Sequence, residues 1–301
     1  MPHDPPNWPT PLLSLKLPSV KASPTDHDHR RLFSAIRHIL RQGSPTCDRG
    51  LTVWLSIPEL SKTEFAAMPV KEQWLAVQHC LSKVYTAGTF EAKKLGRPYL
   101  PIDIIIEEMA GYTRKAFDLY GFFEYHGEAA DDDWHTGLGP SVGESFDRDN
   151  SNTGSIAGCW FEHSALGGTF DHLHAGHKVL LTMAAYASRV QMTCGISGKY
   201  LRFYLIVSLS DKYGPTSTDP SIDALVVSLE TLKGSHDLND KRRANSLEPM
   251  ELLVIDVIGG SDDGNGYKIF DADGTDDIST LKLSSTLIRQ NLARSNQQSI
   301  S

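Results

Sequence analysis

The segment Leu166–His177 constrains this chain more than any other, because it joins a short apolar run, a turn on two glycines and the start of a helix. Its sequence is Leu-Gly-Gly-Thr-Phe-Asp-His-Leu-His-Ala-Gly-His. The expected helix begins with His174 and His177, on either side of Gly176. A helix start offers unpaired backbone N–H groups and the positive end of the helix dipole, which suits a phosphate group. The segment therefore predicts a strand, a turn and a helix around an anion site.

The residues that follow support a helix with one apolar face. Leu180, Met183, Ala184 and Ala187 recur at helical spacing. A lone histidine at a helix start is more often a cap than a ligand. Two histidines around a glycine, just after Gly-Thr-Phe-Asp, are much rarer and favour a functional role. We expect them to donate hydrogen bonds to phosphate oxygens and to stabilise charge as a phosphorus centre is attacked.

Composition limits the classes of protein. The chain has 301 residues, enough for about two domains. A formal net charge of −8 argues against a general nucleic-acid surface. No apolar run approaches the roughly 20 residues that span a bilayer, and 1–10 is proline-rich and polar, so we predict a cytoplasmic protein. The four cysteines are far apart, which favours free thiols over a metal site.

The first half of the chain reads as an α/β unit. Strand-like runs cover Leu12–Leu17, Leu51–Ile57 and Pro101–Ile106. Apolar residues at helical spacing lie between them: Leu32, Ile36, Ile39 and Leu40, then Trp74, Val77, Leu81 and Val84. His27-Asp28-His29 is interpreted as a solvated helix start and not as a metal site. This alternation predicts a layered α/β domain over 1–126, with no chemical constellation of its own.

Glycines and acidic residues then dominate 127–158, which we interpret as a linker. A second domain is expected over 159–292, followed by a polar tail over 293–301. Leu252–Ile258 is expected to form a further buried strand. The acidic stretch that follows it, Ser261–Asp277, lacks the spacing of a calcium loop and is expected to be a solvated loop.

The Gly-Gly-Thr-Phe-Asp run with His-x-Gly-His closely resembles the signature of the nucleotidyltransferase superfamily, in the form found in phosphopantetheine adenylyltransferases and cytidylyltransferases. This resemblance implies a Rossmann-like nucleotidyltransferase domain with a parallel sheet, preceded here by a second α/β domain. It implies that the catalytic residues are Thr169, His174 and His177, with Thr169 positioning the attacking phosphate. It further implies ATP contacts at Gly167, Gly168, Phe170 and Gly176, and substrate contacts at Thr169 and Asp171.

A second motif lies near the C-terminus. Ser284, Ser285 and Thr286 stand at an expected helix start, and Arg289 follows one turn later. Three hydroxyls and an arginine at that position form a second anion site. Alone it would be read as a capped helix. It resembles the element with which this superfamily binds ATP phosphates, and it points to the adenylyl branch.

A third motif follows the buried-strand pattern Leu225–Val227. Polar residues come directly after this strand and on the next helical segment, namely Ser228, Glu230, Thr231, Asn239 and Arg242. Residue types alone favour a strand, a cap and a solvated helix. The run also resembles the eukaryotic and archaeal type of phosphopantetheine adenylyltransferase, which implies that these five residues bind substrate.

The chain departs from this family after the strand-like run Gln191–Ile196. The next strand-like run, Tyr200–Leu209, follows after only a few residues. A parallel crossover needs a dozen or more residues and usually contains a helix. Either these two runs form a hairpin, or the sheet has lost a strand–helix unit. The family carries a helix, a lysine and an arginine in this segment.

The resemblance implies that the chain transfers an adenylyl group from ATP to 4′-phosphopantetheine, giving dephospho-CoA and pyrophosphate, with Mg²⁺ accompanying ATP. The first half of the chain resembles, more loosely, the extension found on fungal forms, and no GxxxxGK[ST] sequence of a fused kinase is present, so the resemblance implies the fungal, monofunctional type. Expected partners are ATP, 4′-phosphopantetheine and proteins of the CoA pathway, with no nucleic acid and no membrane. The alternatives are a cytidylyltransferase and a catalytically impaired nucleotide-binding or scaffold protein.

Overall fold

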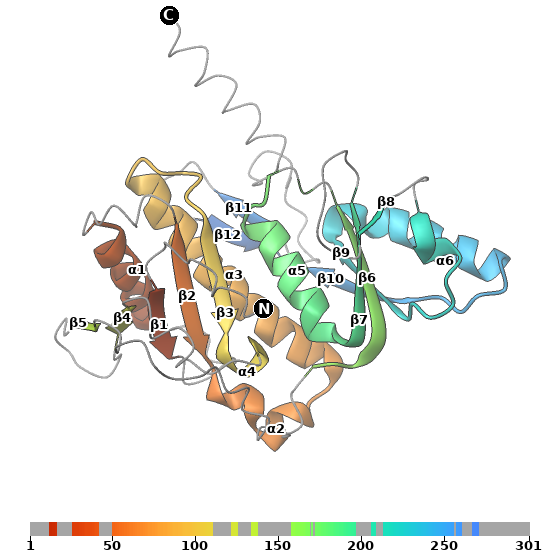
Figure 1. Ribbon diagram of the computed structural model, residues 1–301, viewed down its shortest axis with the longest axis horizontal. Helices are drawn as coiled ribbons and strands as arrows, with labels where there is room; N and C mark the ends of the chain where they lie inside the picture. The colour runs from red at the N-terminus through yellow and green to blue at the C-terminus, as the bar shows by residue number, and fades with distance from the viewer. Residues whose placement is uncertain are drawn as a thin grey trace, which may run out of the picture. The chain divides into compact units, whose positions relative to one another are not determined.

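Tertiary contacts divide the chain into two compact units (Figure 1). The first contains 1–76 and 83–157, and the second contains 77–82 and 158–301. The computed structural model describes these residues: 12–16, 26–41, 50–110, 122–125, 134–137, 158–168, 170, 172–196, 206–208, 213–255, 257–260 and 267–270.

The first unit is built on a five-stranded sheet with the order β3-β2-β1-β4-β5. Strands β1 to β4 are mutually parallel, and β5 runs antiparallel to β4. The strands are β1 (Leu12–Lys16), β2 (Leu51–Ser56), β3 (Ile102–Ile106), β4 (Phe122–Tyr125) and β5 (Trp134–Gly137). The three strands and two long helices predicted for this half are confirmed. Strand β5 lies inside the stretch interpreted as a linker, where four residues were too short a pattern to recognise.

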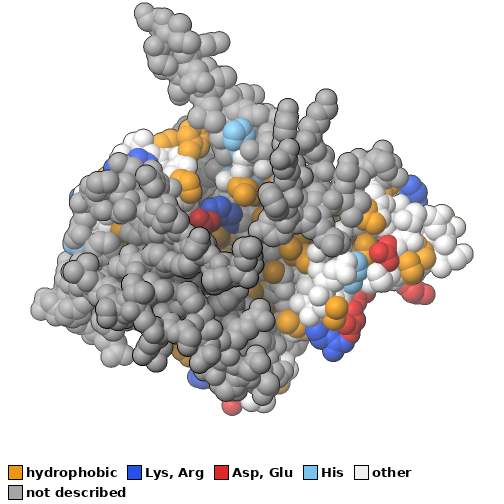
Figure 2. Space-filling model, viewed as in Figure 1, with side chains coloured by type: hydrophobic (Ala, Val, Ile, Leu, Met, Phe, Trp, Pro, Cys, Tyr) orange, Lys and Arg blue, Asp and Glu red, His pale blue; other side chains and the backbone are white. Residues whose placement is uncertain are grey.

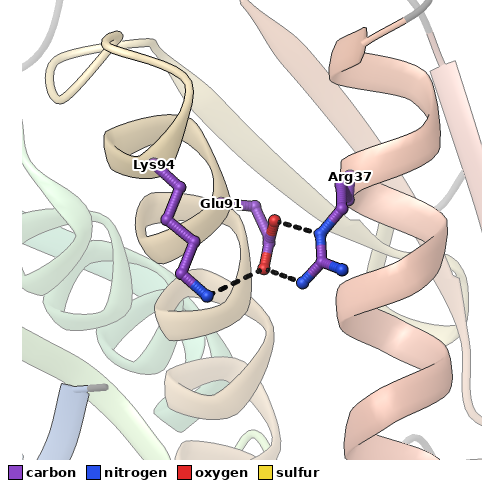
Figure 3. A network of polar contacts seen from close by, with 3 residues as sticks. All are labelled: Arg37, Glu91 and Lys94. Atoms are coloured by element: carbon purple, nitrogen blue, oxygen red, sulfur yellow. Dashed lines mark hydrogen bonds and ion pairs between the residues drawn. The ribbon is translucent and has the colours of Figure 1, made fainter. Parts of the chain in front are cut away.

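Helices lie between the strands of this unit. They are α1 (Asp26–Arg41), the 3-10 turn η2 (Pro58–Ser61), α2 (Thr63–Ala66), α3 (Val70–Lys94) and α4 (Glu107–Ala110). The buried Glu91 of α3 accepts two hydrogen bonds from the guanidinium of Arg37 in α1, both at 2.7 Å (Figure 3). The Lys94 ammonium lies 3.9 Å from the same carboxylate. This pairing ties α1 to α3 and raises the pKa of Arg37, chiefly through its hydrogen bond to Glu91.

The second unit has a five-stranded sheet in which every neighbouring pair is parallel, with the order β10-β9-β6-β7-β8. Its strands are β6 (Phe161–Gly168), β7 (Ser188–Ile196), β8 (Ile206–Ser208), β9 (Ala224–Ser228) and β10 (Glu251–Ile255). When β6 is numbered as the first strand of this unit and the sheet is read from β8 to β10, the strands lie in the order third, second, first, fourth, fifth. This is the order of the doubly wound nucleotide-binding fold, so the predicted Rossmann-like class is confirmed.

Two helices pack on this sheet. Helix α5 (Ala175–Ala187) connects β6 to β7, and its predicted apolar residues Leu180, Met183, Ala184 and Ala187 are all buried. The 3-10 turns η5 (Gly214–Ser217) and η6 (Leu229–Thr231) flank β9, and α6 (Leu232–Ala244) connects β9 to β10. Ala165, Leu225 and Val227 form a core with Leu238 of α6. No helix among the described residues is long and apolar enough to cross a membrane.

Two sequence expectations in this unit need correction. The predicted strand Leu252–Ile258 is divided between β10 and a separate strand, β11 (Val257–Gly260). β11 pairs antiparallel with β12 (Tyr267–Phe270), which lies inside the stretch expected to be a solvated loop. Both strands are only four residues long. A short hairpin next to acidic residues has too few apolar positions to be distinguished from a loop by pattern.

Candidate functional site

The glycine turn lies at the carboxyl end of the central strand of the second sheet. Gly167 and Gly168 are the last two residues of β6, and they pair with Gly195 and Ile196 of parallel β7. On its other side β6 pairs with β9, where Leu166 lies opposite Val226. Gly168 lies two residues further along β6, and Ser228 lies two residues further along β9. The strand order reverses between β6 and β9, and open α/β sheets bind ligands in the crevice outside such a reversal.

Aromatic and imidazole rings fill the space beside two glycines of this turn. A Cβ atom on Gly168 would lie 3.0 Å from the ring of Phe170. A Cβ atom on Gly176 would lie 3.2 Å from the ring of His174. Both distances are shorter than ordinary van der Waals contact, so a larger residue would displace the rings. The glycines therefore allow the rings to lie close to the turn.

The two predicted histidines lie together at the start of α5. His174 is the N-cap residue of α5, with φ −112° and ψ 173°, and its carbonyl accepts the N–H of Lys178 at 3.1 Å. The imidazole rings of His174 and His177 are stacked, with centroids 3.9 Å apart and 24° between the planes. Nδ1 of His177 donates to the carbonyl of His172 at 3.2 Å. The structure thus places both rings at the positive end of a helix that has no acidic residue in its first turn.

The predicted residues after β9 lie at the same end of the sheet as the glycine turn. Ser228 ends β9, and Glu230 and Thr231 belong to the following turn η6. The Thr231 hydroxyl donates to the carbonyl of Ser228 at 3.0 Å. Glu230 and Thr231 are exposed, and Ser228 is half-buried. These three residues therefore lie at the carboxyl end of β9, and their substrate-binding role stays a prediction.

Asn239 and Arg242 have their polar atoms engaged inside the second unit. Asn239 donates to the carbonyl of Met250 and accepts its N–H, both at 2.9 Å. Arg242 is 1% exposed and donates to the carbonyls of Thr216, Asp219, Ile222 and Glu248. Burial lowers the pKa of Arg242, while nearby Asp219 opposes that shift. These contacts count against direct substrate binding and give both residues a structural role. Sequence cannot distinguish a buried arginine from a ligand-binding one at this spacing.

Several predicted site residues lie outside the described residues. They are Thr169, Asp171, Ser284, Ser285, Thr286 and Arg289. Their assignments stay predictions. Sequence reasoning missed one contact, the hydrogen bond between the His177 ring and the backbone carbonyl of His172. Every residue has a backbone carbonyl, so residue types do not reveal such a contact. Among the described residues, no group of three or more His, Cys, Asp or Glu side chains is arranged to hold a metal ion.

A reversal of strand order, a glycine turn and paired histidines at a helix start together define the class of Rossmann-like nucleotidyltransferases. No family model matches the chain. An uncharacterized protein of Schizosaccharomyces pombe is 33% identical over 161 residues, which cover 44% of this chain and 48% of that protein. The phosphopantetheine adenylyltransferase of Saccharomyces cerevisiae is 33% identical over 165 residues, covering 45% of this chain and 50% of that protein.

A shorter archaeal relative is covered much more completely. The phosphopantetheine adenylyltransferase of Methanopyrus kandleri is 31% identical over 138 residues, which cover 36% of this chain and 85% of that protein. The chain belongs to the phosphopantetheine adenylyltransferase family. It spans about half the length of the two fungal relatives.

The alignments also reveal a shortfall within the matched region. The match to the S. pombe protein runs over 161 positions, whereas 44% of 301 residues is about 132. The match to the S. cerevisiae protein runs over 165 positions, whereas 45% of this chain is about 135 residues. In both cases the relative has about 30 residues in the matched region that this chain lacks.

Proposed function

We propose that the second unit binds ATP and 4′-phosphopantetheine and that the family's reaction is adenylyl transfer between them. An oxygen of the pantetheine phosphate attacks the α-phosphorus of ATP in line. The bond from that phosphorus to the bridging oxygen breaks, so dephospho-CoA forms and pyrophosphate leaves. No protein nucleophile is needed, so the protein contributes positioning and charge stabilisation.

The observation that carries this proposal is the pairing of His174 and His177 at the start of α5, beside the carboxyl end of β6. Both rings and the N–H groups of the helix start lie at the place where this fold binds phosphates. Thr169 is proposed to position the attacking phosphate. Ser284, Ser285, Thr286 and Arg289 are proposed to hold the ATP phosphates, and Asp171, Ser228, Glu230 and Thr231 to border the second substrate.

Mg²⁺ is proposed to arrive with ATP. It would be held mainly by phosphate oxygens and water, the ligands it prefers when few carboxylates are present. The ion would neutralise part of the triphosphate charge. A cytoplasmic location and protein partners from the CoA pathway stay predictions from the sequence.

Pyrophosphate release tests the reaction. The 301-residue chain is incubated with Mg²⁺, 4′-phosphopantetheine and either ATP or CTP. Release that needs phosphopantetheine and prefers ATP supports adenylyl transfer. A preference for CTP would instead identify a cytidylyltransferase, and release without phosphopantetheine would identify a nucleotide hydrolase.

A second function, nucleotide binding without turnover, is favoured by one observation. β7 and β8 are parallel, with Cys194 opposite Ile206, so they do not form the hairpin that the sequence left open. Only the nine residues 197–205 connect them. We infer that the roughly 30 residues missing relative to both fungal proteins belong to this crossover. Binding of ATP without pyrophosphate release would identify a non-catalytic nucleotide-binding protein.

A further inference from the structure

Strand β7 carries one extra residue relative to β6 near the start of their pairing. Phe161 of β6 pairs with Ser188 of β7. His163, two residues after Phe161, pairs with Gln191, three residues after Ser188. The extra residue is a β-bulge, and Val190 beside it is 73% exposed. The register of the rest of β7 therefore depends on whether this bulge is present.

The apolar pattern of β7 favours a register without the bulge. In the observed register the buried Thr193 lies opposite Ala165, on the sheet face that packs on α6. Met192 and Cys194 lie on the other face and are only half-buried. If the bulge were absorbed, β7 would move by one residue, and Met192 would lie opposite Ala165 in place of Thr193. Burial of apolar side chains alone would select this bulge-free register.

His163 connects the observed register to a chain of hydrogen bonds. Its Nδ1 lies 3.0 Å from the hydroxyl of Ser221, and its Nε2 lies 2.7 Å from the hydroxyl of Thr193 on β7. The Ser221 hydroxyl donates to the carboxylate of Asp219 at 2.6 Å. This hydrogen bond lowers the pKa of Asp219, so the carboxylate is present as the acceptor. The chain joins β6, β7 and the loop that leads into β9.

The direction of each bond fixes the tautomer of His163. The single proton of the Ser221 hydroxyl is donated to Asp219, so that hydroxyl accepts from Nδ1–H of His163. In a neutral ring Nε2 is then an acceptor, and the hydroxyl of Thr193 donates to it. The amide nitrogen of Gln191, 3.3 Å from Nε2, only donates and agrees with this assignment. Both ring nitrogens are therefore satisfied in the observed register.

The bulge-free register would leave this buried ring without its main donor. His163 is 6% exposed. In that register Val190 would lie opposite His163, and Met192 would replace Thr193. Neither of the two apolar side chains donates a hydrogen bond. An unpaired buried acceptor costs more free energy than an average hydrogen bond contributes. The hydrogen bonds of His163 thus oppose the apolar pattern of β7.

We propose that His163 and its hydrogen bonds form a register lock, which holds Thr193 in place and keeps the bulge in β7. His163 is thereby a positioning residue for the glycine turn, because the locked register keeps Gly195 opposite Gly167. In the bulge-free register Cys194 would lie opposite Gly167 and place a side chain beside the turn. The lock concerns the sheet alone and needs no ligand, so its test is independent of the proposed function.

Methyl NMR of the 301-residue chain, labelled at alanine, methionine, threonine and valine, reports the register. In the locked register the Ala165 methyl contacts that of Thr193, and in the bulge-free register it contacts that of Met192. Thr193→Val keeps the shape of the side chain and removes the donor. A second set of signals with an Ala165–Met192 contact should appear, because loss of a donor to a buried acceptor shifts the register equilibrium about tenfold or more. A single set, with Ala165 in contact with the introduced valine, would overturn the lock.

Two control variants separate the hydroxyl from packing and from the bulge. Thr193→Ser keeps the donor and should show one register, so slippage in this variant would show that the threonine methyl group sets the register. Deletion of Val190 removes the extra residue, and the register without a bulge then again places Thr193 opposite Ala165. Thr193→Val in that background should show one register. Two registers there would overturn the assignment of slippage to the bulge.

Ring ¹⁵N NMR of the unchanged, histidine-labelled chain tests the hydrogen-bond chain without any variant that could fail to fold. Spectra are recorded at mildly alkaline pH, where imidazole rings are ordinarily neutral. The His163 signals are assigned by their loss in His163→Gln. We expect a protonated Nδ1 and an unprotonated Nε2. A His163 ring protonated on Nε2 would overturn the lock, because Thr193 would then not be its donor.

Discussion

The two units share one strand order and differ in how their second crossover is built. In both sheets the strands, numbered within each unit, lie in the order third, second, first, fourth, fifth. The step from β2 to β3 contains the long helix α3, whereas the equivalent step from β7 to β8 has nine residues. This similarity between the two units lies in the order and connection of their strands.

Burial of the two equivalent strands reflects this difference. In β2, Leu51, Val53 and Leu55 are at most 1% exposed, and Trp54 on the other face is fully buried. In β7, Val190 is 73% exposed and Met192 and Cys194 are half-buried. Met192 pairs with Ser164, which donates to Ala184 of α5, so Met192 lies on the α5 face. A parallel sheet is normally covered on both faces, and β7 lacks part of that cover.

The first crossovers of the two units differ in their chemistry. α5 begins with His174, Ala175, Gly176 and His177, with no acidic residue in its first turn. α1 begins with the sequence Asp26-His27-Asp28-His29. The two units therefore share a strand order and differ in the residues at the start of their first crossover helix. On the face shown in Figure 2, charged side chains of both signs are scattered among the described residues.

Restoring the second crossover should have the largest effect. If 197–205 is replaced by the longer segment that we propose the S. cerevisiae relative carries there, pyrophosphate release from ATP and phosphopantetheine should rise at least about 10²-fold, because the lysine expected in that segment would add a donor to the transferred phosphate. The melting temperature should rise as well, since apolar surface of β7 becomes covered. A Gly/Ser insert of equal length is the control and should give neither gain. Full activity of the 301-residue form would refute the inferred loss.

His177→Ala in the restored form should lower kcat by about 10²–10³, as for loss of one donor to the transition state. ATP binding should weaken far less, because the helix start and the other phosphate contacts remain. Initial rates over a range of ATP concentrations separate kcat from KM. An unchanged kcat would remove His177 from catalysis, and Leu173→Ala provides the matched control.

Paired substitutions compare the ion pairs of the two units. Arg37→Met leaves Glu91 buried without its bidentate partner, which should lower the free energy of unfolding by about 2–4 kcal/mol. Arg243→Met removes an exposed pair with Asp240 and should change it by at most about 0.5 kcal/mol. Urea unfolding followed by circular dichroism measures both. Equal changes in the free energy of unfolding would show that the buried Glu91 does not make its ion pair more stabilising than the exposed pair.

Periodicity and residue type predicted the parts of this chain with strong local signals. The strands at 12, 51 and 102, the helix after His177 and the polar end of β9 were all predicted because each has a regular apolar pattern or a capped start. The parallel pairing of β7 with β8 needed the structure, because the few residues between the two strand-like runs left both a hairpin and a lost strand–helix unit open. The structural role of Arg242 also became clear only from the structure, because its four carbonyl partners lie in the turn η5, in the loop before β9 and in the loop before β10.

The smallest expected effect comes from one substitution made in both equivalent strands. Val53→Thr places a hydroxyl in the fully buried β2 and should lower the free energy of unfolding by about 1–3 kcal/mol. Val190→Thr changes a side chain that is 73% exposed and should alter it by less than about 0.5 kcal/mol. In the form with a restored crossover, Val190→Thr should lower the free energy of unfolding by more than it does in the 301-residue chain, if the new helix reaches the start of β7. A large effect of Val190→Thr in the 301-residue chain itself would mean that β7 is already covered, and the contrast between the two crossovers would then fail.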